Sequence, residues 1–296
     1  MYRWIANCLN NAVILVALCT AGLAPYVAAK DFSGLYPHER LERVTQVYGS
    51  NVRGVLYEDI PRYLTPDEKA ALAGVTLEIL PAKINSDLFG FAMDLKTGRM
   101  TITAPAIAFF DDLAVSFAWY DRFKKDPTPI SEYIVRLYSD PDYLAPPLKA
   151  LGVPERAWDQ DAFVDDVSQK ILTSGIAFLL LHELAHWHHQ DRPYDAITPQ
   201  RAQSQELAAD AYAVDVMRRM QTPPYGMVVW FLMTSMLSDG VARTHPLSED
   251  RLEAIAAALE NNPRGFISYE NRKTLTVENI KQLSKDIRFI ADNLRD

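Results

Sequence analysis

Residues 176–186 of this chain read Ile-Ala-Phe-Leu-Leu-Leu-His-Glu-Leu-Ala-His. The apolar run contains no proline, which predicts a helix buried in a domain core. On a helix, residues four apart lie on one face, so His182 and His186 can bind one metal ion together. Glu183 would then lie beside the ion, where its carboxylate can take a proton from metal-bound water. The stretch therefore predicts a helical zinc site with its own general base.

A second helix is predicted to carry two further acidic groups toward this site. Residues 206–210 read Glu-Leu-Ala-Ala-Asp and follow Thr198-Pro199, an N-cap with a first-turn proline. Residues 200–219 contain neither Gly nor Pro, as expected of an uninterrupted helix. Glu206 and Asp210 then share a face, so one can bind the metal while the other accepts the outer N–H of a ligand imidazole. An ordinary acidic helix face is the alternative interpretation.

The residues after His186 exclude one class of zinc site. Zincins that extend the motif to H-E-x-x-H-x-x-G-x-x-H need glycine at position 189 and histidine at position 192, whereas this chain has His189 and Arg192. Another class of zincins takes its third zinc ligand, a glutamate, from a second helix. An aspartate one turn later on that helix supports a ligand histidine. Glu206 and Asp210 match that second pattern.

The first 29 residues resemble an export signal. They hold Arg3, an apolar stretch over residues 12–24, and Val27-Ala28-Ala29, which fits the small-residue cleavage rule. We expect cleavage after Ala29 and an exported, periplasmic protein. A membrane anchor through residues 12–29 is the alternative, because that segment is barely long enough to span a bilayer.

The two cysteines, Cys8 and Cys19, both lie within this segment. Val16-Ala17-Leu18-Cys19 also resembles a lipobox, although Leu18 stands where a small residue is expected. A chain that begins at Lys30 has no cysteine, so its stability must come from core packing and metal rather than disulfides. The net charge of −8 and the lack of a basic run argue against a nucleic-acid partner.

Residues 30–296 are predicted to form one domain with a few strands among many helices. Phe89–Asp94 and Arg99–Thr103 flank a turn and predict a β-hairpin, which either holds an extended substrate or is purely structural. Residues 126–154 are rich in proline yet apolar in part, which favours an inserted cap or lid. The expected helices are a short one around Glu39–Val47, one opened by the Thr65–Glu68 capping box and ending at Leu72, residues 104–125, residues 161–189 with a break near Ser174-Gly175, and Val277–Leu294.

Three motifs in order resemble a known family. They are H-E-L-A-H, then E-L-A-A-D-A-Y-A-V-D-V-M, then Thr244-His245-Pro246 followed by Arg251-Leu252. Together they are similar to the gluzincin metallopeptidases related to the CaaX prenyl protease and HtpX, over about residues 175–258. That family includes soluble periplasmic proteases of envelope protein quality control. Two features depart from it: Ala185 replaces a usual glycine, and a long insertion separates the hairpin from the first motif.

The resemblance implies a role for each site residue. His182, His186 and Glu206 would bind one zinc ion per chain, and Glu183 would be the general base. Asp210 would orient a ligand histidine, His182 in our interpretation, and Arg251 would lie on the helix that follows. His245 would donate a hydrogen bond to the tetrahedral oxyanion or approach the zinc. A histidine that only caps the turn before Pro246 is the alternative interpretation.

The sequence thus predicts a zincin-like α+β domain, mostly helical, with a small hairpin or sheet next to the active-site helix. Its expected activity is that of an exported zinc endopeptidase acting on polypeptides, without a stable membrane span after signal removal. The rival interpretation is a protease-fold binding or chaperone module with negligible turnover. Intact Glu183 argues against that rival, since a lapsed enzyme has no need for the base.

Overall fold

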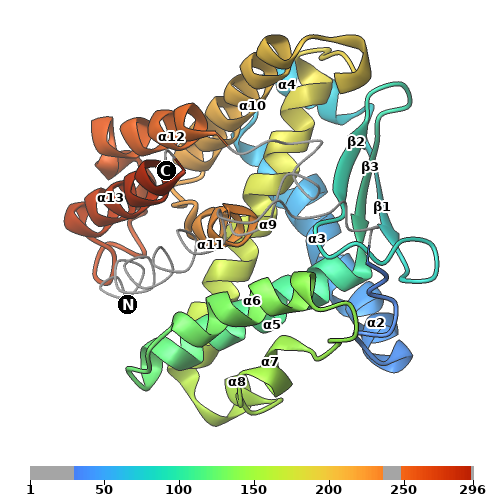
Figure 1. The fold of residues 1–296 in the computed structure, drawn as a ribbon. Coiled ribbons are helices and arrows are strands. Elements are labelled where there is room, and N and C mark those ends of the chain that lie inside the picture. Colours follow the sequence, from blue (N-terminus) through green and yellow to red (C-terminus); the bar gives the residue numbers. More distant parts are fainter. Residues whose placement is uncertain (1–29, 236–247, 295–296) are drawn as a thin grey trace.

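Helix α9, Ala162–His188, is the longest helix among the described residues and passes through their middle (Figure 1). The computed structural model describes residues 30–235 and 248–294. In chain order the elements are α2 His38–Arg43, η1 Val44–Tyr48, α3 Gly49–Gly54, η2 Val55–Asp59, η3 Ile60–Tyr63, α4 Pro66–Leu72, β1 Thr76–Leu80, β2 Phe91–Asp94, β3 Arg99–Thr103, α5 Ala104–Arg122, α6 Thr128–Ser139, α7 Pro147–Ala150, α8 Ala157–Gln160, α9 Ala162–His188, η4 Tyr194–Ala196, α10 Pro199–Arg219, α11 Tyr225–Ser235, α12 Glu249–Asn261, η5 Pro263–Phe266 and α13 Val277–Asn293.

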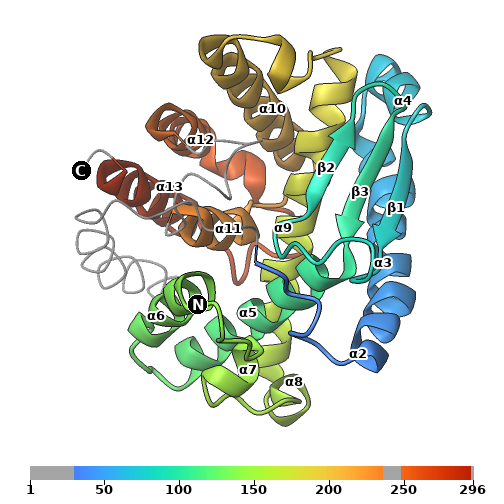
Figure 2. The same ribbon diagram turned by 45° about the vertical axis from the view of Figure 1, so that its right-hand side comes forward.

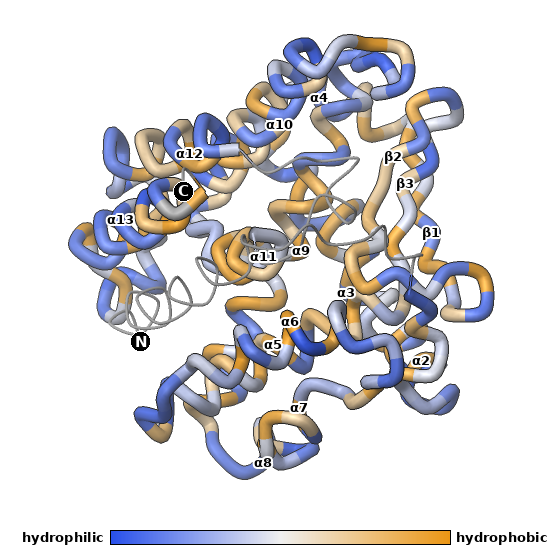
Figure 3. The backbone as a smooth tube through the Cα atoms, in the orientation of Figure 1, coloured by the Kyte–Doolittle hydropathy of each residue, from blue (hydrophilic) through white to orange (hydrophobic). Residues whose placement is uncertain are grey.

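Helix α9 is the central element, and the Asp161 side chain caps it by accepting the backbone N–H groups of Phe163 and Val164. It packs against α5, α10 and α11. A helix surrounded in this way must be apolar on most sides, as the run before His182 predicts. The hydropathy colouring in Figure 3 shows hydrophobic residues concentrated in α9 and α11, at the centre of the molecule.

The predicted break near Ser174-Gly175 is wrong, because α9 is unbroken. Gly175 instead allows a close approach between helices. A Cβ at Gly175 would lie 2.4 Å from the Phe110 ring, and one at Gly226 of α11 would lie 2.0 Å from the carbonyl oxygen of Ile171. The backbone N–H of Gly226 also donates to the Ser174 hydroxyl at 2.9 Å. Glycine thus serves interhelical packing here rather than a bend.

The predicted hairpin is confirmed, and it belongs to a three-stranded sheet of order β1-β3-β2. Strands β2 and β3 pair antiparallel, with Phe91 opposite Ile102 and Asp94 opposite Arg99. Strand β1 pairs parallel with β3 and is not among the predicted elements. Its alternation is nevertheless that of a half-buried strand, with Leu77 and Ile79 buried between more exposed residues. The sheet lies along one side of the helices (Figure 2).

Most of the predicted helices are confirmed, and their capping residues explain where they begin. Thr65 and Glu68 form both bonds of the predicted capping box of α4, and the Thr198 side chain caps α10. Helices α5 and α13 also match their predicted ranges to within a few residues. The fold is therefore mostly helical with a small sheet, consistent with the α+β class.

The prediction around Glu39–Val47 is too short. Five consecutive helical elements, α2 to η3, run from His38 to Tyr63. Buried apolar side chains recur along one stripe of this stretch, namely Leu41, Val44, Val52, Leu56 and Ile60. Gly49 and Gly54 weaken the helical signal in the sequence, and burial of the stripe compensates for their low propensity.

The segment predicted to be a cap or lid contains α6 and α7. Helix α6 buries Ile130, Ile134 and Leu137, and α7 packs against α5. The Lys30 ammonium donates to the carbonyls of Leu137, Asp140 and Tyr143 at 2.6–2.8 Å, where α6 ends. The lid role of residues 126–154 stays a prediction. Among the helices of the described residues, none combines the length and the hydropathy needed to cross a membrane.

Candidate metal centre

Two helices bring three potential metal ligands together. His182 and His186 lie one turn apart on α9, and Glu206 faces them from α10. Their potential ligand atoms all lie within 4.8 Å of one another. The two imidazole Nε2 atoms are 3.1 Å apart, and each lies 3.2–3.4 Å from a Glu206 oxygen. All three side chains are at least 95% buried. This group could hold a metal ion.

A carboxylate faces the outer nitrogen of each imidazole. Asp210 Oδ1 lies 2.9 Å from His182 Nδ1, which is the contact predicted from the shared face of Glu206 and Asp210. Asp191 Oδ2 lies 2.8 Å from His186 Nδ1. An ionised carboxylate only accepts, so Nδ1 carries the proton in both rings. The Nε2 atoms are then directed at the common centre, as metal ligation requires.

The carboxylate of Glu206 is held from two further sides. The Arg251 guanidinium of α12 lies 2.8 Å from Oε2, and the Tyr194 hydroxyl of η4 donates to Oε1. Arg251 also bonds both oxygens of Asp210, at 2.6 Å and 2.9 Å. One arginine therefore links the predicted glutamate ligand to the aspartate that orients His182.

The electrostatics of the group favour a bound cation. Burial lowers the pKa of His182, but the charges and hydrogen bonds of Glu206 and Asp210 raise it by more, to about 10. Burial raises the pKa of Asp210, and the charge and hydrogen bonds of Arg251 then bring that pKa below its ordinary value. Binding a metal requires neutral imidazoles, so the ion would replace their protons.

The charges of the residues present fit a divalent ion. Four buried or nearly buried carboxylates, those of Glu183, Asp191, Glu206 and Asp210, surround the site, and Arg251 is the cation bonded to two of them. Buried negative charge is costly unless a cation compensates it. Two imidazole nitrogens and one carboxylate oxygen are a donor set that suits zinc and leaves a position for water.

The structure brings six predicted site residues to one place: His182, Glu183, His186, Glu206, Asp210 and Arg251. Glu183 is 2% exposed. Burial lowers the pKa of His186, hydrogen bonds to Asp191 and Glu206 raise it by more, and Glu183 adds a smaller upward effect. His245 lies outside the described residues, and its role stays a prediction. His188 and His189 pack with the Tyr212 ring and are not part of the group that could hold a metal.

Sequence reasoning missed Asp191 and Tyr194. Asp191 follows His186 by five residues, beyond the end of α9, where helical periodicity no longer says which way a side chain points. Tyr194 lies in a short 3-10 helix that carries no motif. Only the path of the loop between α9 and α10 reveals their contacts.

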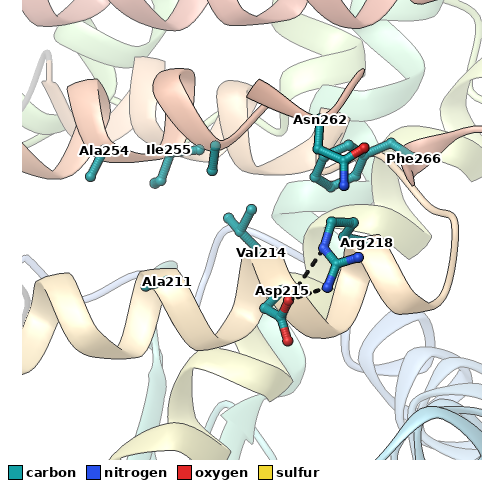
Figure 4. Close-up of a pocket in the computed structure, with 9 residues that line it drawn as sticks. Ala211, Val214, Asp215, Arg218, Ala254, Ile255, Asn262 and Phe266 are labelled. Carbon is teal, nitrogen blue, oxygen red and sulfur yellow. Dashed lines mark hydrogen bonds and ion pairs between the residues drawn. The ribbon is translucent and has the colours of Figure 1, made fainter. Parts of the chain in front are cut away.

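A separate pocket of about 220 Å³ lies between α10 and α12 (Figure 4). Its walls are mainly small and apolar, and its polar residues include Asp215 and Arg218, which bond to each other at 2.6 Å. None of the residues that could bind metal lines it. The pocket is smaller than most small-molecule sites, so the buried centre is the better candidate for chemistry.

Comparison with known proteins agrees with this choice. Residues 142–269 match the family model described as Peptidase U49. No curated protein and no solved structure matches the chain. The matched range runs from before α7 to beyond η5 and includes every residue of the candidate centre. The match to a peptidase family supports a peptidase that acts on polypeptides.

Proposed function

We propose that this protein is a zinc-dependent endopeptidase of the gluzincin type. The observation that carries the proposal is the buried group of His182, His186 and Glu206, with Glu183 beside it, inside the range that matches a peptidase family. The proposed relation to the CaaX prenyl protease and HtpX rests on the sequence motifs. The zincin-like fold is part of the same proposal, supported by the helical ligands and the adjacent small sheet.

His182, His186 and Glu206 would hold the zinc, which would supply a Lewis acid for the scissile carbonyl and lower the pKa of a bound water. Glu183 then accepts a proton from the attacking water while the water oxygen bonds to the carbonyl carbon. When the C–N bond breaks, Glu183 returns that proton to the leaving amine. Asp210 keeps the His182 imidazole oriented throughout, because it accepts the Nδ1–H.

Strand β2 is our proposed docking edge for the substrate backbone. It stands at one end of the sheet order, so within the described residues only one of its sides is paired, and it packs against α9. An unpaired edge offers N–H and C=O groups that an extended peptide can bond. The position of β2 at the edge of the sheet, next to α9, supports the substrate-holding role proposed for the hairpin from the sequence.

A binding or chaperone module without turnover is the alternative. The buried Glu183 at the candidate centre favours the enzyme, because a metal site used only for structure needs no adjacent base. Digestion of casein, with and without a chelator, separates the two. Proteolysis that stops on chelation supports the enzyme, and binding of unfolded protein without cleavage supports the module.

Glu206→Ala is expected to lose most of its zinc on dialysis against a weak chelator. The substitution removes one of three protein ligands and the carboxylate that Arg251 and Tyr194 hold. Elemental analysis of wild-type and variant protein measures the effect. Glu253→Ala is the control and should keep its zinc, because the Glu253 carboxylate pairs with Arg288 of α13 and not with the site. Full zinc occupancy in the Glu206 variant would remove that residue from the site.

We also propose that the protein acts after export to the periplasm, with cleavage after Ala29. Support comes from the signal-like residues 1–29, which lie outside the described residues. Lys30 is tied to the domain through three carbonyls, so cleavage just before it would leave those contacts intact. N-terminal sequencing of protein from the envelope fraction should begin at Lys30. Membrane-bound material beginning at Met1 would favour the anchor through residues 12–29.

A further inference from the structure

The loop between α9 and α10 approaches the candidate centre at two points. Helix α9 ends in a turn in which Gln190 adopts a positive φ of 55°. The N–H of Gln190 bonds the carbonyl of Trp187 at 3.2 Å, and that of Asp191 bonds the carbonyl of His186 at 3.0 Å. This is the Schellman pattern of hydrogen bonds, which reverses the chain direction at a helix end. The reversal returns Asp191 to the helix face that carries His186.

Asp191 is therefore held in place through both its backbone and its side chain. Its N–H bonds the carbonyl of His186, and its carboxylate bonds the ring of the same residue at 2.8 Å. The carboxylate is only 7% exposed. His186 therefore has its ring orientation set by a residue outside the helix, much as Asp210 sets that of His182.

The next part of the loop is attached to α10. Gln205, which is 2% exposed, donates from Nε2 to the carbonyl of Arg192 at 3.1 Å. Tyr194, which is two residues after Arg192, donates its hydroxyl hydrogen to Oε1 of Glu206. Arg251 binds the other oxygen, Oε2. Glu206 is thus bonded at both oxygens by groups from different parts of the chain.

We propose that Asp191 and Tyr194 are positioning residues of the metal centre, Asp191 for His186 and Tyr194 for Glu206. The inference rests on the proposed zinc site. A short loop would then orient two of the three ligands before the ion arrives. Partners of this kind change metal affinity because a ligand that must be reoriented binds less tightly.

Asp191→Asn and Tyr194→Phe test the proposal through the metal itself. Each variant should bind zinc about 10–100-fold more weakly than wild type, the usual effect of losing a hydrogen-bond partner of a ligand. Competition with a chromophoric chelator measures the dissociation constant. Cobalt in place of zinc adds a visible absorption spectrum, which should change because it reports the geometry of the ligands.

Two matched controls change the same chemical groups elsewhere. Asp195→Asn alters an exposed aspartate of the same loop, and Tyr269→Phe removes the hydroxyl of a tyrosine that is 74% exposed. Both should bind zinc and cobalt as wild type does. Asp191→Glu keeps a carboxylate and should recover part of the affinity lost in Asp191→Asn, which a purely steric role would not produce.

The outcomes separate this inference from the proposed function. If the wild-type chain binds no zinc, the zinc site itself is wrong. If wild type binds zinc and the folded Tyr194→Phe and Asp191→Asn variants bind it equally well with unchanged cobalt spectra, the positioning role is overturned and the zinc site stands. Tyr194→Phe removes a single oxygen from a partly exposed side chain, and circular dichroism of the metal-free protein verifies its fold.

Discussion

Glu183→Gln is expected to lower peptide turnover by about 10²–10⁴-fold, the usual contribution of a positioned general base. The amide has nearly the same shape as the carboxylate but cannot take a proton from water. The side chain is 2% exposed, so bulk water cannot easily replace it as the base. Initial rates on a fluorogenic peptide, at zinc saturation, measure the loss.

The same variant should retain its zinc, because Glu183 is not among the three grouped ligands. Glu155→Gln makes the identical change at an exposed position and should leave turnover unaltered. Near-normal proteolysis by Glu183→Gln with full metal content would rule out the proposed mechanism. Loss of zinc together with activity would mean that Glu183 acts on the metal rather than on the water.

Arg251→Ala is expected to reduce the free energy of unfolding of the metal-free protein by about 3–5 kcal/mol. Arg251 is 3% exposed and bonds both Glu206 and Asp210. Its removal would take away the one guanidinium that bonds both buried carboxylates, and the loss of that charge compensation is the costly part. Urea denaturation monitored by circular dichroism gives the difference. Added zinc should recover part of it, since the ion then neutralises Glu206.

Arg218→Ala is the matched control, on the helix that carries both carboxylates. Its partner is Asp215, and the two side chains are 37% and 50% exposed at the rim of the pocket in Figure 4. Exposed ion pairs contribute little, so the loss should stay within about 1 kcal/mol. An Arg251 variant no less stable than the Arg218 variant would show that the buried pairing is not what holds α12 against α10.

Local sequence signals accounted for much of the fold. Capping residues such as Thr65, Thr198 and Asp161 act on the nearest backbone N–H groups, so the starts of α4, α10 and α9 can be read from neighbouring residues. Glycines carried less information. Gly175 suggested a break, whereas the contact with Gly226 of α11 explains it, and that contact joins residues far apart in the chain.

The candidate metal centre also depends partly on local sequence and partly on tertiary packing. The i, i+4 spacing on α9 and on α10 is local geometry, so the sequence alone determined that His182 pairs with His186 and Glu206 with Asp210. Their approach to each other depends on how α10 packs against α9. Arg251 reaches Glu206 from α12, and Asp191 and Tyr194 reach the ligands from a loop. No helical or strand period specifies those directions, and only tertiary packing decided them.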